Sequence, residues 1–201
     1  MPHSLSLGRS GARRRPSPAG LFLREFVRHP VMVGSIIPSS RRLIERMLAP
    51  VEWATTQTFV EYGPGPGTFS SAVLARLAPD ARYIAIDTNA DFIDYLRATV
   101  RDSRFSAVHG SAADVAAIVR DHGATQADQV LSGLPFSTLP PGVGDTIARA
   151  TAAVLRPGGT FLVYQFNPRV RQFLEPHFAK IGHAMEWWNV PPAQLWWARN
   201  D

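Results

Sequence analysis

Residues 59–68 have the sequence FVEYGPGPGT, and this stretch decides the fold. It begins with aromatic and β-branched residues, which are typical of a buried strand, and it includes one acid, Glu61. Three alternating glycines follow, Gly63, Gly65 and Gly67, and then an apolar pattern with helical spacing. A strand, a glycine turn and a helix in this order predict a nucleotide-type crevice at the carboxyl end of a parallel strand.

The turn is poorly suited to a phosphate group. A dinucleotide fingerprint, G-x-G-x-x-G, uses backbone N–H groups and a helix N-terminus to hold a pyrophosphate. Here Thr68 takes the place of the third glycine, and Pro64 and Pro66 have no N–H to donate. The turn instead suits a ligand that has no phosphate, approaches the backbone closely and presents a positive group to Glu61.

This motif resembles the first motif of the class I S-adenosylmethionine-dependent methyltransferases, which is an acid followed by G-x-G-x-G. The resemblance matches Glu61, Gly63, Gly65 and Gly67 without a gap. It implies an α/β fold with a doubly wound, Rossmann-like sheet of seven strands. It also implies that S-adenosyl-L-methionine is the cofactor and that the four matched residues bind it.

A second strand is predicted at residues 83–87 and ends in Asp87, 20 residues after Gly67. An acid at this spacing can reach the ribose hydroxyls of a bound nucleotide. We therefore expect Asp87, with Thr88 beside it, to bind the cofactor. The alternative is that Asp87 only caps the next helix, since Thr88 and Asn89 follow it.

The composition predicts one globular domain. A chain of 201 residues with 45% hydrophobic residues is long enough to bury one core. It has no cysteine, which excludes disulfides and thiolate metal sites, and its six histidines show no short metal-ligand spacing. We expect no metal centre. No apolar run is long enough to span a bilayer.

The charge is unevenly distributed. Residues 1–50 contain nine arginines and two glutamates, a charge of +7. Residues 51–201 contain twelve basic and fourteen acidic residues, a charge of −2, which together with the first part gives the total of +5. This asymmetry predicts an anionic partner surface, either nucleic acid or lipid headgroups.

We expect three parts along the chain. Residues 1–18 mix Ser, Gly, Pro and Arg without periodicity and are predicted to be a disordered basic leader. Residues 19–50 are predicted to form amphipathic helices that act as a membrane or substrate lid. Residues 51–201 are predicted to be the catalytic domain.

The first predicted helix, at residues 19–29, has two distinct faces. Phe22 and Phe26 lie on one side, and Arg24 and Arg28 lie on the other. One interpretation is that the apolar face packs on the core. The other is that this helix anchors the chain to a membrane, because bulky aromatics opposite arginines are typical of interfacial helices.

The next segment resembles a more specific family, the bacterial phospholipid N-methyltransferases. The match lies at Val33-Gly34-Ser35 and at Pro38-Ser39-Ser40-Arg41, ahead of a predicted helix that ends before Pro50. The resemblance runs from about Phe22 to the end of the chain. It implies that Gly34 and Ser35 lie on the cofactor side, and that the substrate or membrane side contains Phe22, Arg24, Phe26, Arg28, Ser39, Ser40 and Arg41.

Beyond Gly67, strands and helices are predicted to alternate as a doubly wound sheet requires. Strands are expected near 58–62, 82–87, 105–109, 128–132, 160–166, 182–189 and 194–199. Helices are expected near 68–78, 90–100, 112–121, 143–155 and 168–178. Residues 156–159 (RPGG) are predicted to form a helix-to-strand turn, and residues 191–192 the turn of a final hairpin.

The third strand is followed by Gly110, Ser111 and Ala112, which we expect beside the cofactor. Members of the resembled family usually have an acid where Ser111 stands, and that acid accepts a hydrogen bond from the adenine amino group. Ser111 is a weaker acceptor. Asp114 lies nearby, but an acid in the first turn of a helix is better explained by the helix dipole.

The fourth strand leads into Ser132, Gly133, Pro135 and Phe136, the predicted catalytic segment, with Ser132 also close to the cofactor. Nucleic-acid amino methyltransferases have Asn, Asp or Ser two residues before this proline, and Gly133 stands there instead. This difference disfavours a nucleobase substrate and agrees with the lipid-methylating family. The Phe136 ring is expected either to attract a methylated ammonium by a cation–π interaction or to be a core aromatic.

Several side chains remain candidates for accepting the proton of the substrate amine, namely Tyr62, Tyr164 and His109, and water is a further candidate. Arg169, with Arg171, follows the fifth strand and is expected either to hold a lipid phosphate or to be a solvated charge. At least one tryptophan of each pair, 187–188 and 196–197, is expected in the core, and the other is a candidate for contact with lipid or a partner.

These observations predict an enzyme that transfers methyl groups from S-adenosyl-L-methionine to the amine of phosphatidylethanolamine and its mono- and dimethyl derivatives. The expected location is the cytoplasmic side of a membrane, on the anionic inner leaflet, with a monomer favoured and nucleic acid disfavoured as partner. Two alternatives stay open. One is an rRNA adenine N6-dimethyltransferase, for which the basic leader would bind phosphates, and the other is a non-catalytic cofactor-binding regulator.

Overall fold

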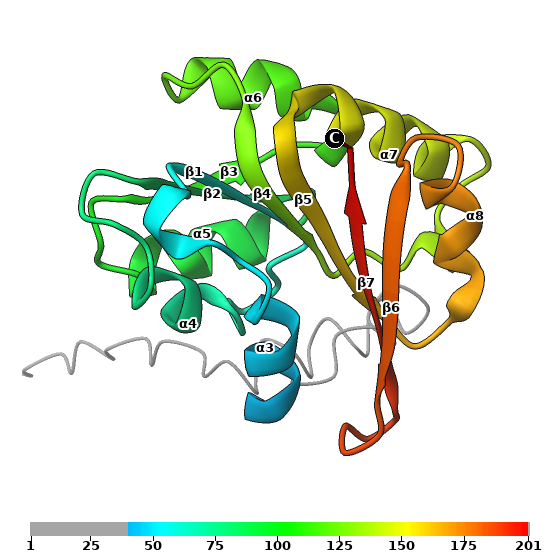
Figure 1. Ribbon diagram of the computed structural model, residues 1–201. Helices are drawn as coiled ribbons and strands as arrows, with labels where there is room; N and C mark the ends of the chain where they lie inside the picture. The colour runs from blue at the N-terminus through cyan, green and yellow to red at the C-terminus, as the bar shows by residue number, and fades with distance from the viewer. Residues whose placement is uncertain (1–39, 201) are drawn as a thin grey trace, which may run out of the picture.

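The computed structural model describes residues 40–200, which form a seven-stranded sheet with helices on both faces (Figure 1). The strand order is β3-β2-β1-β4-β5-β7-β6. β7 runs antiparallel to both of its neighbours, and the other neighbouring strands are parallel. The strands are β1 (Thr58–Tyr62), β2 (Arg82–Asp87), β3 (Phe105–His109), β4 (Ala127–Ser132), β5 (Leu155–Gln165), β6 (Lys180–Glu186) and β7 (Ala193–Arg199). The predicted doubly wound α/β sheet is confirmed.

β1 lies at the centre of the sheet, and all five of its residues are buried. Its side chains alternate between the two faces, so that Phe59 packs into one apolar cluster while Val60 and Tyr62 pack into the other. A central parallel strand covered on both faces needs apolar residues along its whole length. Glu61 is the charged residue in β1.

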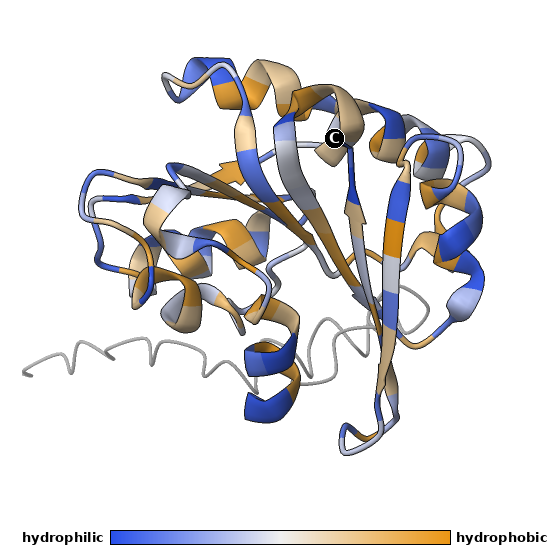
Figure 2. Cartoon of the chain, viewed as in Figure 1, coloured by the Kyte–Doolittle hydropathy of each residue, from blue (hydrophilic) through white to orange (hydrophobic). Residues whose placement is uncertain are grey.

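Helices cover the two faces of the sheet in separate groups. α6 (Val115–Asp121), α7 (Val143–Val154) and α8 (Arg171–Leu174) contribute to the cluster that contains Tyr62. α3 (Arg41–Leu48) and α4 (Ser70–Leu74) contribute to the cluster that contains Phe59, and α5 (Ala90–Thr99) packs against β3. Figure 2 shows hydrophobic residues along the strands and hydrophilic residues on the outer turns of α3. None of the helices found between residues 40 and 200 has both the length and the apolar character needed to cross a bilayer.

α3 is part of the core of the sheet domain. Its N-cap is Ser40, whose Oγ accepts a hydrogen bond from the Leu43 N–H at 3.2 Å. Leu43, Met47 and Leu48 are buried in the same cluster as β1 and α4. The predicted helix before Pro50 is therefore confirmed, whereas the division of the chain into a lid and a catalytic domain at residue 50 stays a prediction.

Two predicted helices are shorter in the structure. The helix expected at 68–78 is only α4, because the preceding residues form a tight turn in which the Gly67 N–H donates to the Pro64 carbonyl at 2.9 Å. The helix expected at 168–178 consists of a 3₁₀ turn (Pro168–Val170) and α8. Pro176 has no N–H with which to continue α8.

The end of the sheet also differs from the predicted boundaries. Residues 156–159 are not a separate turn but belong to the irregular start of β5, which pairs with β4 through a register shift between Ala127 and Gln129. β6 ends at Glu186 rather than at residue 189, since residues 187–192 form the tip of the β6–β7 hairpin. The hairpin itself was predicted correctly, but the expectation that one of Trp187 and Trp188 lies in the core is wrong, because both are exposed at its tip.

Candidate active site

The carboxyl ends of the first four strands meet at one edge of the sheet. The register pairs Tyr62 with both Ile86 and Ser132, and it pairs Asp87 with His109. Because these strands are parallel, the segments that follow them lie at the same edge. This edge, called here the site edge, gathers the glycine turn, Asp87 and the residues after β3 and β4.

The glycine turn requires glycine at its three predicted positions. Gly63, Gly65 and Gly67 have φ angles of 63°, 53° and 87°, a region that other residues rarely adopt. A Cβ on Gly63 would lie 3.0 Å from Leu134 Cδ2, and one on Gly67 would lie 2.7 Å from Leu96 Cδ2. The turn is therefore packed from behind, and it can present bare backbone to a ligand.

Glu61 lies beneath this turn rather than on its open side. Its carboxylate is 1% exposed and accepts a hydrogen bond from the Tyr83 hydroxyl, which lies 3.4 Å from Ser70 Oγ on α4. Burial raises the pKa of Glu61 to about 7, with a smaller upward contribution from Asp87, while the Tyr83 hydrogen bond opposes the rise. The sequence led us to expect direct contact between Glu61 and a cationic group of the ligand. In this buried position the Glu61 carboxylate does not offer such contact. Glu61 can act on a cation in the crevice through its charge.

Tyr83 is a residue of the site that the sequence did not reveal. It lies inside β2 and is fully buried, so its pattern is that of a core aromatic. Only the pairing of β1 with β2 places its hydroxyl at Glu61.

Asp87 connects the end of β2 to the glycine turn. Its Oδ2 accepts from the Gly65 N–H at 3.4 Å, and its Oδ1 accepts from the Asn89 N–H at 2.8 Å. Burial raises the pKa of Asp87 to about 6. The N-cap of α5 is Asn89, whose side chain accepts from Asp91 and Phe92, so helix capping does not account for Asp87. Ribose binding by Asp87, with the exposed Thr88 beside it, stays a prediction.

The segment after β3 is fixed to the same edge. The Gly110 N–H donates to the Asp87 carbonyl at 3.0 Å, and Ala112 is buried. Ser111 Oγ accepts from the Ala113 N–H at 3.2 Å and so caps the short 3₁₀ helix Ala112–Asp114. The hydroxyl is already used locally, which is consistent with a weak contact to adenine.

The segment after β4 brings Gly133 under a tyrosine from β5. Ser132 is fully buried and its Oγ accepts from the Leu134 N–H at 3.2 Å, while the Gly133 N–H donates to the Tyr62 carbonyl at 3.1 Å. A Cβ on Gly133 would overlap the Tyr164 hydroxyl. Tyr164 therefore occupies the space that a side chain at position 133 would need. Sequence patterns did not favour Tyr164 over the other candidates, because residues 133 and 164 meet only through the pairing of β4 with β5.

The predicted contact of Phe136 with an amine is wrong. Its ring is 1% exposed and packs against Phe161, with ring centroids 6.4 Å apart, and against Phe173 at 5.6 Å. Pro135, which starts the 3₁₀ turn Phe136–Thr138, directs the ring into the core. Phe136 is the core aromatic of the alternative interpretation.

Tyr62 is also placed away from the expected chemistry. Its hydroxyl is fully buried and lies 3.1 Å from Thr151 Oγ1 in the last turn of α7, on the opposite face of the sheet from Glu61. Burial raises its pKa, which makes deprotonation harder. His109, at the end of β3, is separated from β4 by two strands. Neither side chain is suited to accept a proton at Gly133.

Other predicted residues lie at the periphery or outside the described part. Arg169 is exposed in the 3₁₀ turn after β5, and its backbone N–H donates to Asn167 Oδ1 at 3.0 Å, so phosphate binding by its side chain stays a prediction. Arg171 pairs with Glu175 at 2.6 Å. Ser40 and Arg41 are described at the start of α3. The remaining predictions, which fall outside residues 40–200, concern Phe22, Arg24, Phe26, Arg28, Gly34, Ser35 and Ser39.

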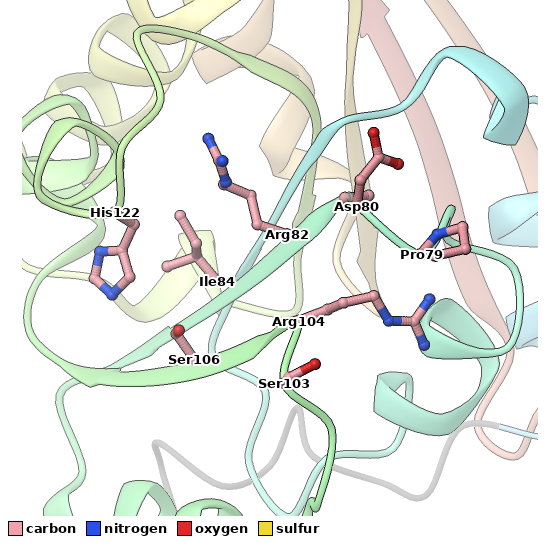
Figure 3. A pocket seen from close by; sticks show the side chains of 9 residues that line it. Pro79, Asp80, Arg82, Ile84, Ser103, Arg104, Ser106 and His122 are labelled. Atoms are coloured by element: carbon pink, nitrogen blue, oxygen red, sulfur yellow. The ribbon is translucent and has the colours of Figure 1, made fainter.

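A hollow of about 320 Å³ lies at the opposite edge of the sheet (Figure 3). It is lined by residues at the amino ends of β2 and β3, among them Arg82 and Arg104. Arg82 donates to the Gly123 carbonyl at 2.7 Å, and Arg104 donates to the Leu77 carbonyl at 2.6 Å and pairs with Asp102 at 2.7 Å. These cations bind parts of the protein itself, and ligands of parallel sheets bind at the carboxyl edge instead.

The site edge and strand order define the class of the protein. The methyltransferase domain family matches residues 59–159, and the chain belongs to this family. Over 181 residues it is 32% identical to an ornithine lipid N-methyltransferase of Singulisphaera acidiphila, covering 89% of this chain and 94% of that protein. The resemblance to S-adenosylmethionine-dependent methyltransferases is confirmed.

Solved structures confirm the fold. The N-methyltransferase NodS from Bradyrhizobium japonicum WM9, in complex with S-adenosyl-L-homocysteine, aligns with a TM-score of 0.65 over 89% of this chain and 96% of that chain, at 15% identity. The precorrin 8W decarboxylase from Methanobacterium thermoautotrophicum aligns with a TM-score of 0.60 over 84% of this chain and 94% of that chain, at 16% identity.

The cofactor is S-adenosyl-L-methionine, as the family implies, and the site edge fits it. The glycine turn leaves room for close approach, and it has prolines where a phosphate-binding turn would need N–H donors. Beneath it, the Glu61 carboxylate is buried with a neutral hydroxyl as its hydrogen-bond partner. A positively charged ligand without phosphate suits this combination.

Proposed function

We propose that this protein methylates the amine of a membrane lipid. The main support is the 32% identity to an ornithine lipid N-methyltransferase, which extends over 94% of that protein. Two acceptors share the required chemistry, an amine on a flexible headgroup. Phosphatidylethanolamine, with its mono- and dimethyl derivatives, is favoured by the segment at 33–41, and ornithine lipid is favoured by the relative.

The glycine turn and Asp87 would hold the cofactor. Bare backbone at Gly63 and Gly65 would face it, and the Asp87 carboxylate would accept hydrogen bonds from the ribose hydroxyls. When bound, the cofactor supplies a methyl group on a positively charged sulfonium sulfur. The Glu61 carboxylate below the turn would stabilise that charge, and in return the charge would favour the ionised form of Glu61.

The amine would be oriented at the end of β4. Gly133 has no side chain, so the Tyr164 hydroxyl and the backbone of residues 132–135 are the groups placed there. The neutral amine nitrogen would receive that methyl group through its lone pair, and the electron pair of the broken C–S bond would stay on sulfur. Aligning the amine with the methyl group is the main task of the protein, and orientation of this kind lowers a barrier by up to about 7–11 kcal/mol.

The test is methyl transfer to defined acceptors. The full chain is mixed with labelled S-adenosyl-L-methionine and vesicles that contain phosphatidylethanolamine, its monomethyl derivative or ornithine lipid, and with rRNA in a separate reaction. We expect label in the lipid fraction, and the preferred vesicle identifies the acceptor. Label only in RNA would establish the adenine methyltransferase alternative. Cofactor binding without transfer to any amine would establish the non-catalytic regulator.

A further inference from the structure

The β6–β7 hairpin exposes an apolar group at its tip. Among residues 40–200, the large hydrophobic side chains that are exposed are Trp187, Trp188 and Val190, with exposed fractions of 68%, 74% and 82%. The tip extends beyond the rest of the domain, beside α3 (Figure 1). Large exposed aromatics held together in this way mark an interaction surface.

The tip is held firmly by two buried polar residues. Glu186 is 0% exposed, and its carboxylate accepts from the Trp188 N–H at 3.1 Å and from Arg46 at 3.2 Å. Asn189 is 2% exposed, and its Oδ1 accepts from the Ser40 N–H at 3.1 Å. These hydrogen bonds fix the backbone of the tip and join it to Arg46 and to the N-cap residue of α3.

Exposed arginines on α3 lie beside the hairpin tip. Arg41, Arg42 and Arg46 on α3 are exposed, and the Arg42 guanidinium lies 5.9 Å from the centre of the Trp188 ring. Arg42 and Arg46 both pair with Glu186, at 3.5 Å and 3.2 Å. One glutamate does not neutralise three arginines, so these side chains together keep a net positive charge. Tryptophan beside arginine is the combination that binds the headgroup region of an anionic bilayer.

The hairpin tip lies on the site edge. β7 is antiparallel to β5, and Gln194 at its start pairs with Gln165 at the end of β5. The tip that precedes β7 is consequently at the carboxyl end of β5, as Gly133 is at the carboxyl end of β4. A flat surface in contact with the tip would face the site edge.

We propose that Trp187, Trp188 and Val190, with Arg41 and Arg42, form a membrane-docking surface. The apolar side chains enter the interface of an anionic bilayer, and the arginines contact lipid phosphates. Docking places Gly133 near the headgroups. This inference deepens the proposed function, on which it rests for a substrate that resides in the membrane.

The first experiment measures docking with full-length protein. Vesicles of brominated phosphatidylcholine and phosphatidylglycerol should quench the tryptophan fluorescence of the wild type and co-sediment with it. We expect Trp187→Ala/Trp188→Ala to lower the vesicle affinity at least about tenfold and to remove the quenching, because Trp53, Trp196 and Trp197 lie away from the tip. Arg41→Glu should weaken binding, and the matched control Arg120→Glu on α6 should not.

Unchanged vesicle affinity and quenching in the tryptophan variant would overturn the inference. Loss of self-association in that variant, measured by light scattering, with vesicle binding intact would assign the surface to a second copy and also overturn it. Unchanged cofactor binding by calorimetry shows that the variant is folded. Transfer to detergent-dispersed lipid amine tests the proposed function separately, because it should survive the tryptophan substitutions. If the wild type docks through the tip but methylates no lipid, the proposed function fails and the docking inference stands.

Discussion

Two buried glutamates, one under the glycine turn and one at the base of the β6–β7 hairpin, have opposite surroundings. Glu61 is 1% exposed, and its hydrogen-bond partner is the neutral Tyr83 hydroxyl. Glu186 is 0% exposed, and it pairs with Arg42 and Arg46. Burying a carboxylate is costly unless a cation or several donors compensate. At the hairpin, α3 supplies the cations for Glu186, whereas the turn leaves that role for Glu61 to a ligand.

The different surroundings of Glu61 and Glu186 indicate different roles. A carboxylate with built-in cations fixes a structure, and at the hairpin it joins β6 to α3. A carboxylate whose pKa is raised by burial can stabilise a nearby cation through its charge, and at the turn it lies below the place where the sulfonium of the cofactor would be held. The same substitution, glutamate to glutamine, should therefore have opposite effects at the two positions.

The largest effect on stability is expected for Glu61→Gln. The folded-state pKa of about 7 lies above the ordinary value of 4.5, so the wild type loses stability as the pH rises from about 4.5 to about 7, by about 3 kcal/mol at about 1.36 kcal/mol per pKa unit. Glutamine does not ionise, so the variant should be more stable by about this amount above pH 7 and no more stable near pH 4. Urea unfolding across this pH range measures the difference.

The control for Glu61 is Tyr83→Phe, which removes the hydrogen bond that lowers the pKa of Glu61. The loss of stability should then extend to higher pH. Cofactor affinity, measured by calorimetry, should fall in Glu61→Gln because the carboxylate charge is lost. A variant with the same pH dependence as the wild type would show that Glu61 carries no unusual proton affinity.

The next effect concerns catalysis at Gly133, which follows β4, the strand next to β1. Gly133→Ala places a methyl group against the Tyr164 hydroxyl, so methyl transfer should fall about a hundredfold in kcat/KM, about 2.7 kcal/mol, with little change in cofactor affinity. The matched control is Gly182→Ala in β6, where a Cβ would meet Trp197 at an ordinary 3.6 Å. Full activity in Gly133→Ala would mean that the amine does not approach this position.

Glu186→Gln should destabilise the fold, in contrast to Glu61→Gln. The amide lacks the charge that pairs with Arg42 and Arg46. Its NH₂ group also cannot accept hydrogen bonds from the Trp188 N–H and the arginines as the carboxylate does. We therefore expect the free energy of unfolding to fall by about 2 kcal/mol at pH 7. Glu45→Gln, which weakens the exposed pair with Arg76, is the control and should change stability by less than about 1 kcal/mol. Thermal unfolding compares the two. Equal effects of Glu186→Gln and Glu45→Gln would show that burial adds nothing to the ion pairs of Glu186.

The smallest effect is expected for Ser40→Ala. It removes the N-cap of α3 at the point where α3 meets Asn189 of the hairpin, at a cost of about 1 kcal/mol. Ser71→Ala, at an exposed position of α4, should stay within about 0.5 kcal/mol of the wild type. A hydrogen-exchange measurement should show faster exchange in α3 only in Ser40→Ala.

The sequence predicted the strands well because a doubly wound sheet has regular signals. The strands at 58–62, 82–87 and 105–109 match the structure at both ends. The glycine turn and the acid of the second strand also lie together at the site edge, as the spacing predicted. These features depend on local patterns, which a single sequence displays.

The errors arose where a side chain's partner is distant in the chain. Tyr62 and Glu61 are adjacent, but successive residues of a strand face opposite ways, and the Tyr62 hydroxyl meets Thr151 on the far face. Phe136 looked available because the sequence does not show that Phe161 and Phe173 surround it. The partners of Glu186 lie 140 or more positions away in α3, and no local pattern announces them.

The reversed direction of β7 has a consequence for successive turnovers. Along the site edge, the residues predicted to hold the donor follow β3, β2 and β1, the hairpin tip lies at the carboxyl end of β5, and Gly133 after β4 lies between them. Donor and acceptor would thus enter from opposite halves of one edge. A headgroup seated by the docked hairpin need not leave while spent cofactor is exchanged, which would favour processive methylation of one lipid over single additions to many.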